Sequence, residues 1–193
     1  MKTPSDFVLE LAKDTQIGQL ELGLYKYLPE STRDVRQIIR SSRKSTTPDY
    51  LLSLKERARG QDRDLALHSR VWLTDSNIKH VPMIDFTTGD LEPHMGAVRT
   101  LMKKFSIQNA FLFSSGRSFH LYGLNLLSEG DWKKFMGHIL LLNPENTQET
   151  NEDRVTDSYW VGHRLIAGYG SLRLSCHQEH YLSPPVFYRE LTL

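Results

Sequence analysis

The sequence has little cysteine, little net charge and no long apolar run. Cys176 is the only cysteine, so an internal disulfide is excluded and a reducing compartment fits. No apolar stretch approaches the length that spans a bilayer, and the N-terminal residues lack the apolar core of a signal peptide. We therefore expect a cytoplasmic protein with no membrane partner. The formal net charge of +1 does not point to nucleic acid in the way that a strongly basic domain would.

Two common nucleotide-binding signatures are also absent. The sequence contains no Walker A loop and no Gly-x-Gly-x-x-Gly run leading into a helix, so P-loop hydrolysis and Rossmann-type dinucleotide binding lose their usual support.

What the chain does have is the composition of a folded domain. Its 193 residues are 39% hydrophobic and 24% charged, which suffices for one core and one active centre.

The first third of the chain predicts an arm of helices and loops, because its apolar residues recur at helical spacing. We assign this arm to residues 1–66. Within it, four arginines recur at steps of three and four and would share one face of a helix: Arg33, Arg36, Arg40 and Arg43. This basic stripe is either a phosphate-binding surface for nucleic acid or an ordinary solvated face, and the pattern does not decide between them.

The rest of the chain, residues 67–193, predicts a sheet covered by helices. Short segments rich in β-branched and aromatic residues predict strands at 69–75, 80–86, 109–115 and 118–124. Apolar spacing predicts a helix over about 91–105 and a second helix that begins at a cap formed by Ser128 with Asp131. Residues 143–157 are polar and predict an exposed loop, and the C-terminal third predicts strands joined by turns. The fold class is therefore α/β (α+β), a mixed sheet with covering helices.

The hexapeptide from Ser115 to His120 is the most informative segment. It joins two hydrophobic strands through a short turn that contains Gly116 and Arg117. Backbone N–H groups, an arginine and a histidine in such a turn suit the oxygens of a polyphosphate. The alternative interpretation is a plain β-hairpin with a polar tip.

This hexapeptide resembles the second motif of the archaeo-eukaryotic primase superfamily, the primase-polymerases. In that motif a Ser-Gly-Arg-Gly-x-His run follows a strand, and here Ser118 stands where the family usually has its second glycine. The resemblance implies a primase-polymerase-like fold in which His120 contacts the triphosphate of a nucleotide. Ser115 and Arg117 would lie close to it.

The first motif of that family is an acidic pair separated by one residue at the end of a strand. Asp85 stands at the matching place, followed by Phe86 and Thr87. Alternation along a strand puts residues 85 and 87 on one face, where two carboxylates could hold Mg²⁺ or Mn²⁺ ions. Thr87 departs from the pattern, so one metal ligand is missing unless Asp90 or Glu92 replaces it.

The third motif is one acid on a strand after the second helix, and Asp157 is the best candidate. With Asp85 it would be a catalytic, metal-binding residue. The family also has a late arginine that reaches the nucleotide phosphates. Arg173 matches it, with Arg164 as a rival, and a structural role for either arginine remains an alternative.

Other chemistries have weaker support. Cys176, His177, His180 and the nearby His163 are metal-binding residue types, but they lack a second cysteine pair and any standard zinc spacing, so we do not expect zinc. Cys176 more simply serves as a small buried apolar residue than as a nucleophile.

Two functions follow from the resemblance. One is a primase-polymerase-like nucleotidyltransferase that acts on nucleoside triphosphates and a DNA or RNA template or primer. The other is a catalytically inactive module of the same fold that binds a nucleotide or nucleic acid, which Thr87 favours.

Overall fold

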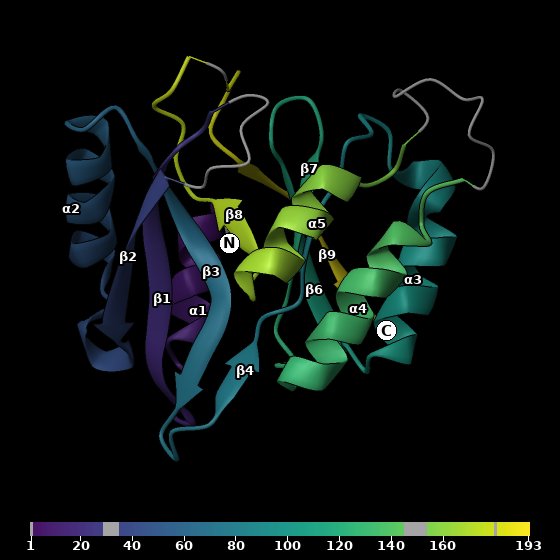
Figure 1. Ribbon diagram of the computed structural model, residues 1–193, viewed down its shortest axis with the longest axis horizontal. Helices are drawn as coiled ribbons and strands as arrows, with labels where there is room; N and C mark the ends of the chain where they lie inside the picture. The colour runs from purple at the N-terminus through teal and green to yellow at the C-terminus, as the bar shows by residue number, and fades with distance from the viewer. Residues whose placement is uncertain (1, 29–34, 145–153, 180) are drawn as a thin grey trace.

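Two antiparallel β-sheets lie side by side in the computed structural model of this chain (Figure 1). The structure describes residues 2–28, 35–144, 154–179 and 181–193. No helix in these ranges has the length and apolar character of a membrane span.

The first sheet has the strand order β2-β1-β3-β4, and β8 pairs with β3 as well. The strands are β1 (Ile17–Lys26), β2 (Val35–Ser42), β3 (Asp64–Leu73), β4 (Ile78–His80) and β8 (Ser171–Arg173). Strand β1 forms because its leucines alternate with polar or small residues. Leu20, Leu22 and Leu24 are fully buried on one face, and Glu21 and Gly23 lie on the other.

The second sheet has the order β5-β7-β6-β9. Its strands are β5 (Met83–Asp85), β6 (Asn109–Ser114), β7 (Phe119–Gly123) and β9 (Val186–Thr192). Strands β6 and β7 form the hairpin that carries the hexapeptide. The other described elements are α1 (Pro4–Leu11), η1 (Arg43–Ser45), α2 (Pro48–Arg59), η2 (Glu92–His94), α3 (Met95–Lys104), α4 (Glu129–Leu140) and α5 (Ser158–Ala167).

Two hydrophobic cores result from this arrangement. One lies between the first sheet, the helices α1 and α2, and one face of the second sheet, from which Phe113 and Tyr122 point inward. The other lies between the opposite face of the second sheet and the helices α3 and α4, where Leu121 meets the fully buried Trp132. The second sheet is therefore covered on both faces, and its short strands are correspondingly apolar.

The mixed α/β architecture and most elements of the second half confirm the sequence prediction. The helix expected over 91–105 forms as η2 and α3, and the cap of α4 forms as expected, with the Ser128 hydroxyl accepting the backbone N–H of Asp131. Strands also form at the four places where the sequence predicted them.

The structure corrects the prediction of a purely helical arm. Residues 1–66 do contain α1 and α2, but they also supply β1 and β2, and the boundary placed after residue 66 falls inside β3. The predicted helix of four arginines is wrong, since Arg36 and Arg40 lie on the strand β2 and Arg43 opens η1. Arg33 lies outside the described residues. A spacing of four keeps two residues on one face of a strand as well as of a helix, which made the pattern ambiguous.

The loop expected over 143–157 is also partly wrong. Residues 145–153 lie outside the described residues, but Val155 and Thr156 are fully buried. Thr156 forms a β-bridge with Phe86, and α5 begins directly afterwards. The sequence analysis did not predict α5.

Gly23 offers a direct test of packing in the first sheet. A Cβ atom there would lie 2.4 Å from Nε2 of His68, whose ring is fully buried. We expect Gly23→Ala to lower the free energy of unfolding by about 1–3 kcal/mol, because the ring has no room to retreat.

Chemical denaturation measures this effect. Gly137→Ala is the matched control, because its Cβ meets nothing within 4 Å in the exposed middle of α4, and it should raise stability by up to about 1 kcal/mol. Equal effects from the two substitutions would contradict the packing described here.

Candidate active site

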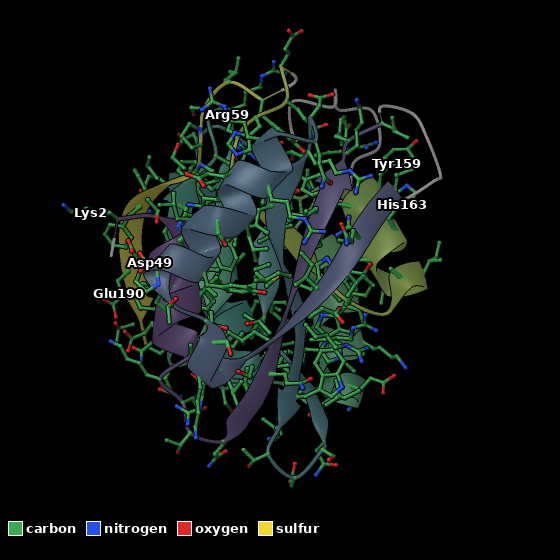
Figure 2. The ribbon with its side chains drawn as sticks, turned by 90° about the vertical axis from the view of Figure 1, so that its left-hand side faces the viewer. Lys2, Asp49, Arg59, Tyr159, His163 and Glu190 are labelled. Carbon is green, nitrogen blue, oxygen red and sulfur yellow. The ribbon has the colours of Figure 1, made fainter. Side chains whose placement is uncertain are left out.

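A pocket of about 830 Å³ opens where the two sheets and α5 meet. Residues from distant parts of the sequence line it. Of the residues that the sequence analysis singled out, these lie on its wall: Arg36, Asp85, Thr87, Ser115, Arg117, Ser118, His120, Asp157, His163, Arg164 and Arg173. Figure 2 shows Tyr159 and His163 of α5 on the opposite side of the molecule from Asp49 of α2.

Asp85 and His120 are brought together by strand pairing. They are directly opposite each other in the β5–β7 ladder, so their side chains point to the same face. Nε2 of His120 lies 3.5 Å from a carboxylate oxygen of Asp85. Nδ1 of His120 is buried and has no hydrogen-bond partner among the described residues. The imidazole therefore contacts Asp85 through one nitrogen, and its other nitrogen has no partner among the described residues.

Asp157 reaches the same wall from the other side of the chain. The bridge between Phe86 and Thr156 sets the two segments side by side, and the backbone N–H of Asp157 lies 3.4 Å from the carbonyl oxygen of Asp85. The expected strand at Asp157 is wrong. Its side chain instead caps α5, accepting the backbone N–H of Tyr159 at 2.8 Å, because an aspartate oxygen suits an unpaired N–H at a helix start.

Burial sets the protonation states of this cluster. Burial and the negative charge of Asp157 together raise the pKa of Asp85 to about 7, with Arg173 and Arg164 partly offsetting the rise. Burial, with a smaller contribution from Arg173, lowers the pKa of His120 to about 3. Near neutral pH the imidazole is therefore uncharged, and the contact between His120 and Asp85 is not a full ion pair.

Thr87 does not replace the missing carboxylate. It lines the pocket, but its hydroxyl donates a hydrogen bond to the carbonyl oxygen of Arg154. The two alternatives named from the sequence are also occupied elsewhere: a carboxylate oxygen of Asp90 accepts the N–H of Glu92, and Glu92 forms an ion pair with Arg189. Neither of them is on the pocket wall.

The turn of the hairpin is well defined. Gly116 has φ +103°, a conformation that favours glycine, which explains why the turn needs a glycine there. Ser118 carries no such strain, and its hydroxyl lies 3.0 Å from that of Ser115. Serine therefore fits where the primase motif usually has its second glycine. Arg117 is exposed at the tip and lines the pocket.

Arg173 is held by the protein itself. Its guanidinium donates to the carbonyl oxygens of Ser115, Ser175 and Ser183 and lies 4.3 Å from the ring centre of Tyr181. Through these bonds it joins β8 to the hexapeptide turn. Arg164, the rival named from the sequence, comes from α5 and also lies on the pocket wall.

Other predicted residues lie elsewhere. Arg40 is beside Glu21 and Trp72 on the first sheet, and neither Arg40 nor Arg43 lines the pocket. The thiol of Cys176 is 3.6 Å from the carbonyl oxygen of Tyr181, and His180 lies outside the described residues.

The aromatic side chains of the pocket were not predicted from the sequence. Tyr25, Tyr27, Tyr159, Trp160 and Tyr181 all line it. Only Tyr25 had a usable signal, since it continues the alternation of β1. The others come from segments without a periodic pattern.

The donor set fits one divalent cation. Asp85 and Asp157 are close enough for the charge of one to raise the pKa of the other, and a cation between them would relieve that repulsion. Mg²⁺ is commonly held by one or two carboxylates together with substrate phosphates. In the part of the chain that the structure describes, no three His, Cys, Asp or Glu side chains gather as a metal site, so the two carboxylates would need ligands from the substrate or water to complete a site.

One comparison with known proteins gives a match. The family model described as AEP-like, archaeo-eukaryotic primase 1D-like, matches residues 44–186, which is most of the chain. No curated protein and no solved structure matches the chain. The matched range includes every pocket residue discussed here except Tyr25, Tyr27 and Arg36.

The electrostatics of Asp85 predict a pH-dependent stability. Its pKa is about 7 in the folded chain against an ordinary value of 3.8, so folding favours the protonated form. The stabilisation that the protonated carboxyl of Asp85 contributes is fully present below about pH 4 and is lost as the pH rises to 7. We therefore expect Asp85→Asn, in EDTA, to be more stable than wild type by on the order of 2 kcal/mol above pH 7, with little difference near pH 4.

Thermal unfolding across this pH range tests the expectation. Asp49→Asn, on the exposed first turn of α2, is the control and should follow the pH dependence of wild type. A stability difference for Asp85→Asn that stays constant from pH 4 to 8 would show that Asp85 is not the titrating group.

Proposed function

This chain belongs to the AEP-like archaeo-eukaryotic primase family, and from that premise we propose that its pocket binds a nucleoside triphosphate and transfers the nucleotide to the end of a nucleic acid. One observation carries the proposal: Asp85, His120 and Asp157 come from distant parts of the sequence and lie on the wall of one pocket. Asp85 and His120 have strongly shifted pKa values, and such groups in a cleft are typical of a functional site.

His120 is suited to hold a phosphate oxygen. It is uncharged because its pKa is about 3, so one ring nitrogen carries a proton that it can donate. Its buried Nδ1 lacks a partner among the described residues, and binding a phosphate oxygen would satisfy it. Arg117 at the hairpin tip and Arg164 on α5 add positive charge to the same pocket.

Arg173 has a supporting role in this proposal. Its guanidinium is bound to three carbonyl oxygens, so it holds the Ser115 turn in place and contributes charge at a distance. This differs from the direct phosphate contact that the family resemblance implies.

Asp85 and Asp157 would hold Mg²⁺ or Mn²⁺ together with the triphosphate, and the ion would supply charge neutralisation on the phosphates. In the transfer, a 3′-hydroxyl oxygen forms a bond to the α-phosphorus, and the bond from that phosphorus to the bridging oxygen breaks. Pyrophosphate leaves and the hydroxyl proton passes to solvent. The pocket residues orient the triphosphate so that the attacking and leaving oxygens lie in line.

A second candidate function has its own observation. Thr87 supplies no carboxylate, and its hydroxyl is already bonded to the carbonyl oxygen of Arg154. The same pocket could therefore bind a nucleotide without transferring it, as a recognition module of this fold. The missing negative charge would lie where charge develops in the transition state, so its loss should affect transfer far more than binding.

Nucleotide binding is tested first. We expect His120→Ala to weaken the binding of a nucleoside triphosphate by about 10- to 100-fold, the value of one hydrogen bond to a charged group. Isothermal titration with ATP, GTP and their deoxy forms measures it. His138→Ala on the surface of α4 is the matched control and should bind as wild type does. Absence of binding by the wild-type chain would refute both candidate functions.

Transfer is tested by primer extension with Mn²⁺, using DNA and RNA primers. We expect Asp85→Asn and Asp157→Asn each to lower the rate by about 100-fold or more, because each removes charge from the reacting centre. Unchanged rates in both variants would exclude these residues from catalysis.

Thr87→Asp separates the two candidates. It restores the acidic pair of the family motif on a residue that already lines the pocket, so we expect tighter Mn²⁺ binding, because affinity rises with the number of charged ligands. Thr88→Asp, one residue along and off the pocket wall, is the control. If wild type binds nucleotide without extending primers and Thr87→Asp gains extension, the recognition module is the natural function.

A further inference from the structure

The first sheet has a face that is open along its edge strand β2, whose residues are mostly exposed. The helices α1 and α2 pack on its other face, where the buried leucines of β1 lie. Figure 1 shows α1 behind β3 on the far side of this sheet, with no described helix drawn over β2 and β1 on the near side. An uncovered sheet face normally carries small polar side chains, so its composition here is informative.

Arginine and apolar side chains occupy this face of β2. The residues opposite Tyr25, Gly23 and Glu21 of β1 are Arg36, Ile38 and Arg40, and alternation puts all three on the open side. Ile38 is 46% exposed and the side chain of Arg40 is 54% exposed. The edge strand therefore offers both positive charge and apolar surface to solvent.

Guanidinium groups and aromatic rings alternate across the face. Arg40 lies 4.2 Å from the ring centre of Trp72, and Arg70 lies 5.7 Å from the same ring. Arg70 is also 4.4 Å from the ring centre of Tyr169, and Arg36 is 5.8 Å from it. These contacts form one continuous row from Arg40 to Arg36, which we call the arginine-aromatic row.

A buried acid organises the row from beneath. The carboxylate of Glu21 is fully buried, and its oxygens accept bonds from Arg70 at 2.7 Å and from Arg40 at 3.4 Å. It also lies 2.9 Å from Nδ1 of His68. Two guanidiniums bind this one carboxylate, and Arg36 lies 3.0 Å from Nε2 of the same His68. With three arginines and one acid, the row keeps a net positive charge while its side chains are fixed in position.

The row runs into the nucleotide pocket. Arg36 belongs to the row and lines the pocket, and its guanidinium lies 2.7 Å from the hydroxyl of Ser171, another pocket residue. Tyr25 lies under Arg36 at 5.3 Å and lines the pocket too. A chain molecule lying along the row would therefore reach the pocket at one end.

We propose that the arginine-aromatic row binds a single-stranded nucleic acid and leads it to the pocket. Single strands bind proteins through positive groups that meet phosphates and through rings and guanidinium planes on which bases stack. A duplex keeps its bases paired and would use only the charge. An acidic protein would likewise make no use of the rings. The proposal depends on the proposed function only for the direction of the strand toward the pocket.

Part of the row lies outside the range that the family model matches. Strands β1 and β2, which supply Glu21, Arg36 and Arg40, precede residue 44, where that range begins. Arg70, Trp72 and Tyr169 lie within it.

The test is fluorescence anisotropy with labelled oligo-dT and oligo-rU of about 12 nucleotides, within the range of known single-strand sites. We expect Trp72→Ala to weaken binding about tenfold, the value of one lost stacking contact, and Trp72→Phe to restore most of the affinity. Arg40→Gln should reduce the slope of log K against log salt by about 0.7. Arg59→Gln, an equal charge change on α2, is the control and should bind as wild type does (Figure 2).

Three results would overturn the proposal. One is unchanged oligonucleotide affinity in both Trp72→Ala and Arg40→Gln. Another is duplex DNA binding as tightly as the single strand. The third is heparin binding equally tightly and with the same dependence on Trp72, which would indicate a general polyanion surface.

Nucleotide titrations keep this proposal separate from the previous one. Trp72→Ala and Arg40→Gln should bind nucleoside triphosphate as wild type does, and His120→Ala should lose nucleotide affinity but keep oligonucleotide affinity. Loss of both ligands in every variant would show one shared site and contradict a separate row.

Discussion

The antiparallel pairing of β5 with β7 is the constraint on which the site depends. It sets Asp85 directly opposite His120, and the residue after Asp85 bridges to Thr156, which brings Asp157 alongside. Backbone hydrogen bonds thus bring together three groups that are distant in sequence. Because the core between the second sheet and α3 and α4 holds these strands rigidly, the site needs no long flexible loop to assemble.

Burial in the pocket disfavours the charged forms of two of these residues. Burial makes charge expensive at both Asp85 and His120, raising the pKa of one and lowering that of the other. Such a site is suited to a ligand that carries its own charges, as a cation with a triphosphate does, because a bound cation would favour the charged form of Asp85. The first sheet handles charge differently: there Glu21 is buried with direct partners, and its pKa is lowered despite the opposing effect of burial, because His68 and Arg70 bind it.

The sequence predicted the second half of the fold and about half of the pocket residues, but the prediction for the first third was wrong. The hexapeptide motif and the helix spacing of α3 and α4 depend on local patterns, which a single sequence carries. The strand β1 had an equally local signal in its alternating leucines, but Arg36 and Arg40 suggested a helix because a spacing of four fits both structures. The cap role of Asp157 and the clamp role of Arg173 could not be predicted, since each depends on partners that only the folded chain brings near. The arginine-aromatic row joins β2, β3 and the segment after α5 and has no signature along the sequence.

The most direct test of the central claim is a crystal structure with Mn²⁺ and a non-hydrolysable nucleoside triphosphate, using the anomalous signal of manganese. The account predicts one manganese peak between the carboxylates of Asp85 and Asp157, with a phosphate oxygen in hydrogen-bond contact with the ring of His120. A triphosphate bound away from these three residues, or manganese at other carboxylates, would contradict it.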